Sequence, residues 1–221
     1  MWSGDTYRQA VVKYIRDHAV PIDGRDSYQF GIYTGNTFVF IYKMFRKYGL
    51  DVKRILAFDS FEGLPDEKPG MVKHPNWNRH EFNMKYLFQT QDTRAIISNI
   101  EKQLPDRDIR TEWYEGYFNK VLNDHFLATD PRPAFWVDLD VDLYQSTIDV
   151  LDFMIPNGLI LPGTIVSMDD WGGCEEYKGG ESLAWKEMIE KYRVDAKEIH
   201  SYTSGDREHC QKAFIVTEIG A

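Results

Sequence analysis

The chain has 221 residues, of which 43% are hydrophobic, and this is enough for one α/β domain with a sizeable core. Its formal net charge of −9 argues against general nucleic-acid binding, which needs clustered Lys and Arg side chains to displace counterions from phosphates. No signal-peptide pattern, membrane-length apolar run, linker or repeat is present, so we expect a single domain, 1–221, in the cytoplasm.

Short apolar runs alternate with helical periodicities along the chain. This alternation predicts an α/β fold in which a mostly parallel sheet carries helices on both faces. The expected elements, in chain order, are a helix over 6–18, a strand over 27–32, a helix from the turn at 35–37 to about 48, a strand over 54–58, a helix over 93–104, a short strand over 109–113, a strand over 134–137, a helix with Tyr144, Ile148, Leu151 and Ile155 on one face, a strand over 158–168, a helix over 181–192 and a strand over 213–217.

The segment at about 66–90 is polar and has no clear periodicity. Loops of this length inside a compact domain are often lids or binding loops. The segment contains His74, His80 and several aromatic residues, so it could be a flap that covers an acceptor and excludes water. The alternative is a peripheral insertion whose aromatic side chains pack on the domain.

Five aspartates follow two of the most apolar predicted strands. Asp138, Asp140 and Asp142 come after one strand, and Asp169 and Asp170 come after the next. In open α/β sheets ligands bind at the carboxyl ends of strands, and like charges that meet there raise one another's pKa unless a cation compensates. Oxygen-rich clusters suit Mg²⁺ or Ca²⁺, and Mn²⁺ is also suitable. Helix capping or solvent exposure would explain one of these carboxylates, but not all five.

Gly31 and Gly35 lie in the turn after the first strand, where glycine allows the backbone to approach a ligand closely. The turn lacks the GxGxxG and GK[ST] patterns of dinucleotide and phosphate loops, and an ordinary strand-to-helix turn is the alternative. Asp59 ends the second strand, where a carboxylate can accept hydrogen bonds from ribose hydroxyls. Together these residues favour a ligand that carries a nucleoside.

Four segments resemble, in the same order, motifs of the macrocin O-methyltransferase family. They are Ile55–Pro65, which is similar to the FDSFEGLP signature; Gly116-Tyr117-Phe118; Leu139–Thr147; and Asp169-Asp170-Trp171, followed by Gly180–Trp185. The resemblance covers about residues 27–187. It implies the class I methyltransferase fold, a Rossmann-like seven-stranded sheet that binds S-adenosylmethionine. It also implies Mg²⁺-dependent methylation of a hydroxyl on a small molecule, usually a sugar of a natural product.

Carried over by position, the resemblance implies a role for each matching residue. The metal ligands would be Asp140, Asp169 and Asp170. The residues at the cofactor would be Gln29, Gly31, Gly35, Asp59, Ser60, Gly116, Tyr117, Phe118 and Asp138. One departure is Gln29, because the family usually has Glu there; glutamine accepts a hydrogen bond but carries no charge for the cofactor's ammonium group.

The mechanism we expect is direct in-line transfer, with metal coordination lowering the pKa of the acceptor hydroxyl. Asp140 is the preferred base, and His74 or His80 from the flap is the other candidate. A rival is a glycosyltransferase in which Asp138-Leu139-Asp140 is a metal-binding DxD motif, although the FDSFEGLP segment has no evident use there. A third interpretation is a non-catalytic cofactor-binding scaffold. The expected partner is a small-molecule hydroxyl acceptor, with no nucleic acid or membrane, and a homo-oligomer is left open.

Overall fold

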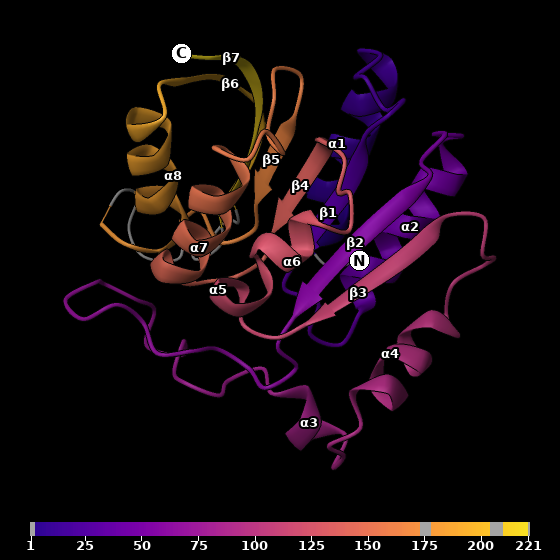
Figure 1. Ribbon diagram of the computed structural model, residues 1–221, viewed down its shortest axis with the longest axis vertical. Helices are drawn as coiled ribbons and strands as arrows, with labels where there is room; N and C mark the ends of the chain where they lie inside the picture. Colours follow the sequence, from indigo (N-terminus) through magenta and orange to yellow (C-terminus); the bar gives the residue numbers. More distant parts are fainter. Residues whose placement is uncertain (1–2, 173–177, 204–209, 221) are drawn as a thin grey trace.

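The computed structural model describes residues 3–172, 178–203 and 210–220, and it contains a seven-stranded sheet (Figure 1). The strands are β1 (Asp26–Phe30), β2 (Arg54–Asp59), β3 (Arg110–Glu115), β4 (Ala134–Leu139), β5 (Ile165–Met168), β6 (Val194–Thr203) and β7 (Cys210–Ile219). Their order in the sheet is β3-β2-β1-β4-β5-β7-β6, and β7 is antiparallel to both of its neighbours. The mostly parallel sheet that the sequence predicts is therefore confirmed.

Helices cover both faces of the sheet. They are α1 (Ser3–Asp17), α2 (Asn36–Lys47), α3 (Met84–Leu87), α4 (Thr93–Glu101), α5 (Phe118–Val121), α6 (Asp124–Leu127), α7 (Tyr144–Met154) and α8 (Gly180–Lys191). One hydrophobic cluster packs α1, α2 and α4 against the sheet, and a second packs α6, α7 and α8 against the opposite face (Figure 1). In the central strand β4 every residue is buried, as its continuous apolar sequence predicts.

The chain order of the strands reverses between β1 and β4, which lie side by side in the middle of the sheet. At such a switch point the loops after the two strands run to opposite sides and leave a crevice at the carboxyl ends. The loop after β1 and the acidic segment after β4 both begin at this place. The topology therefore brings together residues that lie more than 100 positions apart in the sequence.

The predicted strands differ from the structure by a few residues at several ends, and most clearly in two places. The predicted strand over 158–168 is wrong in its first part, because only Ile165–Met168 is extended. Gly158 and Gly163 have positive φ angles of 69° and 89°, so the chain turns there. Leu159 and Ile160, which lie between these glycines, are nevertheless buried, so the apolar run resembles a strand in the sequence. Strand β6 is not among the predicted elements, because it is a largely polar strand at the edge of the sheet.

The segment 66–90 is mostly irregular and runs from the end of β2 past α3 toward α4 (Figure 1). It is attached to the domain at several points. The Glu67 carboxylate accepts the backbone N–H groups of Tyr144 and Gln145 at 2.8 and 3.1 Å, which caps the N-terminus of α7. Trp77 is buried in a small hydrophobic cluster beside Leu143. Within the described residues, no helix is both long and apolar enough to span a bilayer.

Candidate active site

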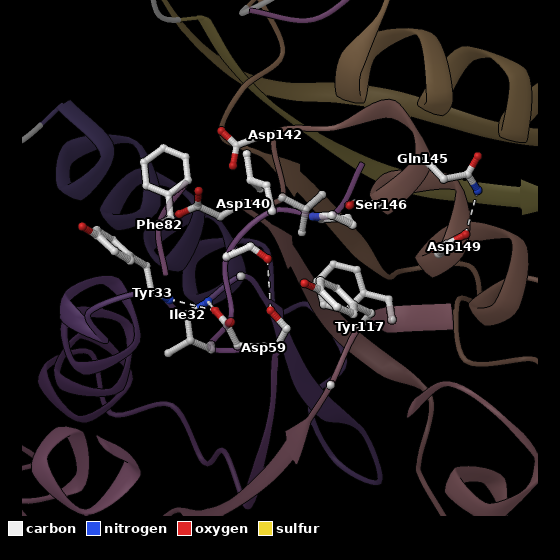
Figure 2. A pocket seen from close by; sticks show the side chains of 18 of the residues that line it. Ile32, Tyr33, Asp59, Phe82, Tyr117, Asp140, Asp142, Gln145, Ser146 and Asp149 are labelled. Atoms are coloured by element: carbon white, nitrogen blue, oxygen red, sulfur yellow. Dashed lines mark hydrogen bonds between the residues drawn. The ribbon is translucent and has the colours of Figure 1, made fainter. Parts of the chain in front are cut away.

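A cavity of about 370 Å³ opens at the carboxyl ends of the central strands (Figure 2). Its walls come from the loops after β1, β2, β3 and β4, and from the first turns of α5 and α7. Among the residues predicted to bind the cofactor, those that line it are Gly31, Asp59, Ser60, Gly116, Tyr117 and Phe118. The volume and the mixture of aromatic and polar walls are typical of a small-molecule site.

Gly31 lets the loop after β1 touch the segment after β4. Its φ is +81°, and a Cβ atom at this position would lie 1.8 Å from the carbonyl oxygen of Asp140. Any other residue would therefore push the two strand ends apart. Gly35 has a similar φ of +79°, but its Cβ would lie 2.6 Å from the Ile100 side chain of α4. Gly35 is not among the cavity residues, and the close contact it permits is between helices α2 and α4.

Asp59 joins the loops after β1 and β2. One carboxylate oxygen accepts the N–H groups of Ile32 and Tyr33 at 2.7 and 2.9 Å, and the other accepts that of Phe61 at 2.6 Å. Burial raises the pKa of Asp59, while the three backbone donors act in the opposite direction. A carboxylate has about four acceptor positions, so one remains for a ligand hydroxyl. Asp59 faces the cavity and can contribute this acceptor (Figure 2).

Gln29 and Asp138 lie beside each other in the β1–β4 register and are not among the cavity residues. Both are buried, with 2% of each residue exposed. The amide nitrogen of Gln29 has no hydrogen-bond partner within the described structure. Asp138 accepts a hydrogen bond from Ser167 at 2.6 Å and from Arg8 at 2.9 Å. Their predicted roles at the cofactor therefore remain predictions.

The three aspartates predicted as metal ligands do come together. One carboxylate oxygen from each of Asp140, Asp169 and Asp170 can be chosen so that all three lie within 4.8 Å of one another. Burial, with the Asp169 charge second, raises the pKa of Asp140 to about 8. The pKa values of Asp142 and Asp170 are also raised well above normal, first by burial and then by neighbouring carboxylates. Such a cluster of oxygens fits a hard divalent cation, which would relieve this repulsion.

Glu181 is a further buried carboxylate in this cluster. Its two oxygens accept the backbone N–H groups of Val141 and Asp170 at 3.1 and 3.0 Å, so it ties the segment after β4 to the segment after β5. Burial and then the Asp170 charge raise its pKa well above normal. In the sequence, Glu181 lies in the Gly180–Trp185 segment that resembles a family motif, but no role is predicted for it. No sequence signal identifies this role, because the two backbone contacts of Glu181 come from separate loops that only the tertiary structure brings together.

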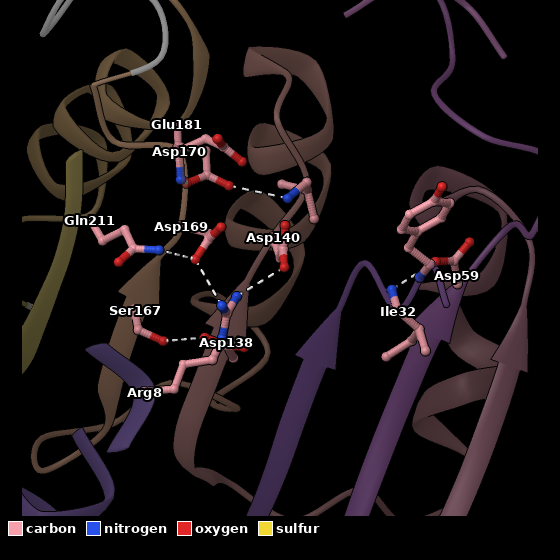
Figure 3. A network of polar contacts seen from close by, with 12 residues as sticks. Arg8, Ile32, Asp59, Asp138, Asp140, Ser167, Asp169, Asp170, Glu181 and Gln211 are labelled. Atoms are coloured by element: carbon pink, nitrogen blue, oxygen red, sulfur yellow. Dashed lines mark hydrogen bonds and ion pairs between the residues drawn. The ribbon is translucent and has the colours of Figure 1, made fainter. Parts of the chain in front are cut away.

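Arg8 of α1 supplies a positive charge to the cluster (Figure 3). Its Nε donates to Asp138 at 2.9 Å, and its two terminal nitrogens donate to Asp140 and Asp169 at 2.9 and 2.8 Å. Only 2% of Arg8 is exposed. Sequence reasoning missed this residue, although Arg8 lies three and four positions before Val11 and Val12 and so falls on the apolar face of the helix.

The two histidines considered as bases lie outside the cavity lining. His74 packs against Trp77, with 5.6 Å between the ring centroids. His80 is exposed, and its Nδ1 lies 3.3 Å from the carbonyl oxygen of Glu62. Asp140, the preferred base, does line the cavity.

Comparisons with known proteins identify related sequences and folds. A family model described as Macrocin-O-methyltransferase (TylF) matches residues 6–199. A Streptomyces olivaceus protein described as 8-demethyl-8-(2,3-dimethoxy-alpha-L-rhamnosyl)-tetracenomycin-C 4'-O-methyltransferase is 31% identical over 150 residues, which cover 66% of this chain and 52% of the relative. The match thus spans about half the length of that relative.

Two solved structures are similar over almost the whole chain. The calicheamicin methyltransferase CalS11 has a TM-score of 0.67 at 17% identity, covering 92% of this chain and 77% of its own. The O-methyltransferase NovP has a TM-score of 0.68 at 19% identity, covering 97% and 79%. At these identities the likeness concerns the fold, and it confirms the predicted class I methyltransferase architecture.

Proposed function

Because the chain belongs to the macrocin-O-methyltransferase family, we propose that it transfers a methyl group from S-adenosylmethionine to a hydroxyl of a small molecule, with the help of a divalent cation. The observation that carries this proposal is the position of Asp140. This residue lines the cavity and also belongs to the cluster of three carboxylates. A cation held by the cluster would therefore lie at the edge of the cavity.

The cofactor end of the cavity is formed by the loops after β1, β2 and β3. Gly31 brings backbone to the cavity wall without a side chain, and Asp59 offers a carboxylate acceptor to the ribose. Tyr117 and Phe118 add aromatic surface that suits an adenine ring. When bound there, S-adenosylmethionine supplies an electrophilic methyl group on a sulfonium sulfur.

The metal end of the cavity is formed by the loop after β4, and the loop after β5 contributes the other two carboxylates of the cluster next to Asp140. Asp140, Asp169 and Asp170 would hold Mg²⁺, which supplies Lewis acidity that lowers the pKa of a hydroxyl. We assign Asp140 as the proton acceptor, because its carboxylate both lines the cavity and belongs to the cluster that would hold the cation and the acceptor hydroxyl. Glu181 orients the backbone on either side of this cluster through its two N–H contacts.

The acceptor that we propose is a sugar hydroxyl, on a free or glycosylated natural product. Polar side chains line the part of the cavity near α7, where Gln145 donates to Asp149 at 2.8 Å, and both can bind sugar hydroxyls (Figure 2). Tyr33 and Phe82 form an edge-to-face pair with ring centroids 5.4 Å apart, and both also line the cavity. This mixture suits a sugar with an apolar substituent. The name of the Streptomyces relative, which refers to a rhamnosyl group, supports the same acceptor class.

The test combines binding and turnover. Calorimetry should detect S-adenosylhomocysteine binding, and mass spectrometry with a panel of glycosides should detect methyl transfer that requires Mg²⁺. Asp169→Asn should abolish the metal-stimulated activity, whereas Asp23→Asn, at an exposed position near the start of β1, should not. Full activity with a chelator present would contradict the metal role.

The same calorimetry separates the rival functions. Binding of a nucleoside diphosphate sugar in place of S-adenosylhomocysteine would favour the DxD glycosyltransferase. In that case Asp138 would have to leave its buried contacts with Arg8 and Ser167. Cofactor binding without turnover on any glycoside would favour the non-catalytic scaffold.

A further inference from the structure

Arg8 contacts three carboxylates through three different nitrogens, and no two of these carboxylates are neighbours in the sequence. A guanidinium group is planar and its donors have a fixed geometry, so each contact constrains the other two. The carboxylate of Asp138 is buried in strand β4, and its contact with Nε holds the forked guanidinium group of Arg8 next to the sheet. The two remaining branches reach Asp140 after β4 and Asp169 after β5.

These two branches bind one oxygen on each of two proposed metal ligands. Arg8 takes Oδ2 of Asp140 and Oδ1 of Asp169, and Gln211 also donates to Oδ1 of Asp169 at 2.5 Å (Figure 3). Within the described residues, the other oxygen of each carboxylate accepts no hydrogen bond and remains for a cation. Arg8 therefore fixes the orientation of two ligands that come from different loops.

Arg8 also compensates charge. The carboxylates gathered here are Asp138, Asp140, Asp142, Asp169, Asp170 and Glu181. Like charges held together in a poorly solvated site repel one another strongly. A buried guanidinium in contact with three of them offsets part of that repulsion when no metal is bound.

We propose that Arg8 is a positioning residue of the metal site. Its guanidinium group orients Asp140 and Asp169, and its positive charge offsets the negative charge of the carboxylates before the cation binds. The proposal rests on the metal site of the proposed function. It predicts that the charge and the fork geometry of Arg8 have separable effects. The charge stabilises the metal-free protein, and the fork geometry raises the affinity for the cation.

A second arginine, which is half-buried and also pairs with a buried aspartate, provides a control. Arg54 donates to the fully buried Asp26 through Nε at 3.0 Å and also pairs with Glu112 at 3.3 Å. Its contacts lie at the start of β2, at the opposite end of the strand from Asp59 and the cavity. Replacing Arg54 breaks a partly buried ion pair without touching the acidic cluster.

The experiment compares Arg8→Lys and Arg8→Gln with Arg54→Lys and Arg54→Gln. Mn²⁺ binding is measured by electron paramagnetic resonance, and thermal unfolding is followed in EDTA and in increasing Mg²⁺. Arg8→Lys keeps the charge but loses the fork, so it should weaken Mn²⁺ binding about tenfold, as outer-shell changes commonly do. Arg54→Lys should bind Mn²⁺ like the wild type. Arg8→Gln should lower the unfolding temperature in EDTA, and Mg²⁺ should restore more of this loss than it does for Arg54→Gln.

The outcomes distinguish the inference from the proposed function. If the wild type binds no Mn²⁺, the proposed metal site is wrong, and the inference fails with it. If the wild type binds Mn²⁺ and Arg8→Lys binds it equally well, the positioning role alone is overturned. If Mg²⁺ restores no more stability to Arg8→Gln than to Arg54→Gln, Arg8 is an ordinary structural ion pair and the counter-charge role is overturned.

Discussion

The contact between Gly31 and the backbone of Asp140 leads to a quantitative prediction for Gly31→Ala. A Cβ atom at Gly31 would lie 1.8 Å from the Asp140 carbonyl oxygen, whereas real contacts of this kind are essentially never under 3.0 Å. The two segments would therefore have to separate by at least 1.2 Å, the difference between these distances. That movement would strain the 3.0 Å hydrogen bond from the Asp140 N–H to the Phe30 carbonyl and the 3.0 Å bond from the Gly31 N–H to the Phe58 carbonyl.

The magnitude follows from these two effects. The positive φ of +81° at Gly31 costs an alanine about 1–2 kcal/mol. Each buried backbone group that loses its partner adds about 1–3 kcal/mol. With two such groups, we expect Gly31→Ala to reduce the free energy of unfolding by about 3–8 kcal/mol, a large part of the stability of a typical domain. Gly24 has a φ of +69° and nothing within 4 Å of an added Cβ, so Gly24→Ala should cost only about 1–2 kcal/mol.

Urea unfolding, followed by circular dichroism, measures both variants against the wild type. The comparison isolates the contact with Asp140, because the two glycines share the same backbone region. If Gly31→Ala is too unstable to purify, a soluble Gly24→Ala made in the same way still supports the difference. Equal losses for the two variants would refute the argument that the loops after β1 and β4 meet at Gly31.

Three further predictions concern the carboxylates. Glu181→Ala removes the acceptor for the N–H groups of Val141 and Asp170, so the free energy of unfolding measured in urea should fall by about 2–4 kcal/mol. A fall of less than about 1 kcal/mol would contradict the two contacts. Glu67→Ala removes the cap of α7 and should lower the free energy of unfolding by about 1 kcal/mol in the same assay. If the carboxylate acts on the helix dipole, 1 M salt should reduce this difference. Burial raises the pKa of Asp140 to about 8, so between about pH 4 and pH 8 the folded metal-free protein holds a proton that the unfolded chain has released. The contribution of this group to the free energy of unfolding is therefore full below about pH 4 and declines as the pH rises to about 8. In EDTA, Asp140→Asn should flatten the dependence of the unfolding temperature on pH over this range. An unchanged slope would show that other groups cause the pH dependence.

That acidic side chains gather at one edge of the sheet could be predicted from a local rule, and the family resemblance then selected three of the five aspartates as the proposed metal ligands. Asp140 follows β4 and Asp169 follows β5, and carboxyl ends of adjacent parallel strands meet at one edge of a sheet. The apolar runs identify the strands, so the positions of the acids follow. The same rule places Gly31 and Asp59 at the cavity, where the structure has them.

Arg8 and Glu181 follow no comparable rule. Arg8 lies 132 positions before Asp140, and its contact depends on how α1 packs across the sheet. Periodicity can show that Arg8 falls on a buried face, but it cannot show which groups that face meets. Glu181 is similar, because its two hydrogen bonds go to backbone atoms in two separate loops. Backbone N–H groups are present at every residue except proline, so a sequence contains no signal of which ones need an acceptor.

By itself, the sequence determined the order of the main strands and helices and the positions of the acids at strand ends, because both depend on local patterns of apolar and polar residues. Only the tertiary structure decided which of these residues meet. It separates Gly31, which touches Asp140, from Gly35, which touches α4, although both have the same residue type and nearly the same φ. It also brings the Arg8 guanidinium to three acids from two strands. Such contacts depend on the packing of segments distant in the chain, and local patterns do not record that packing.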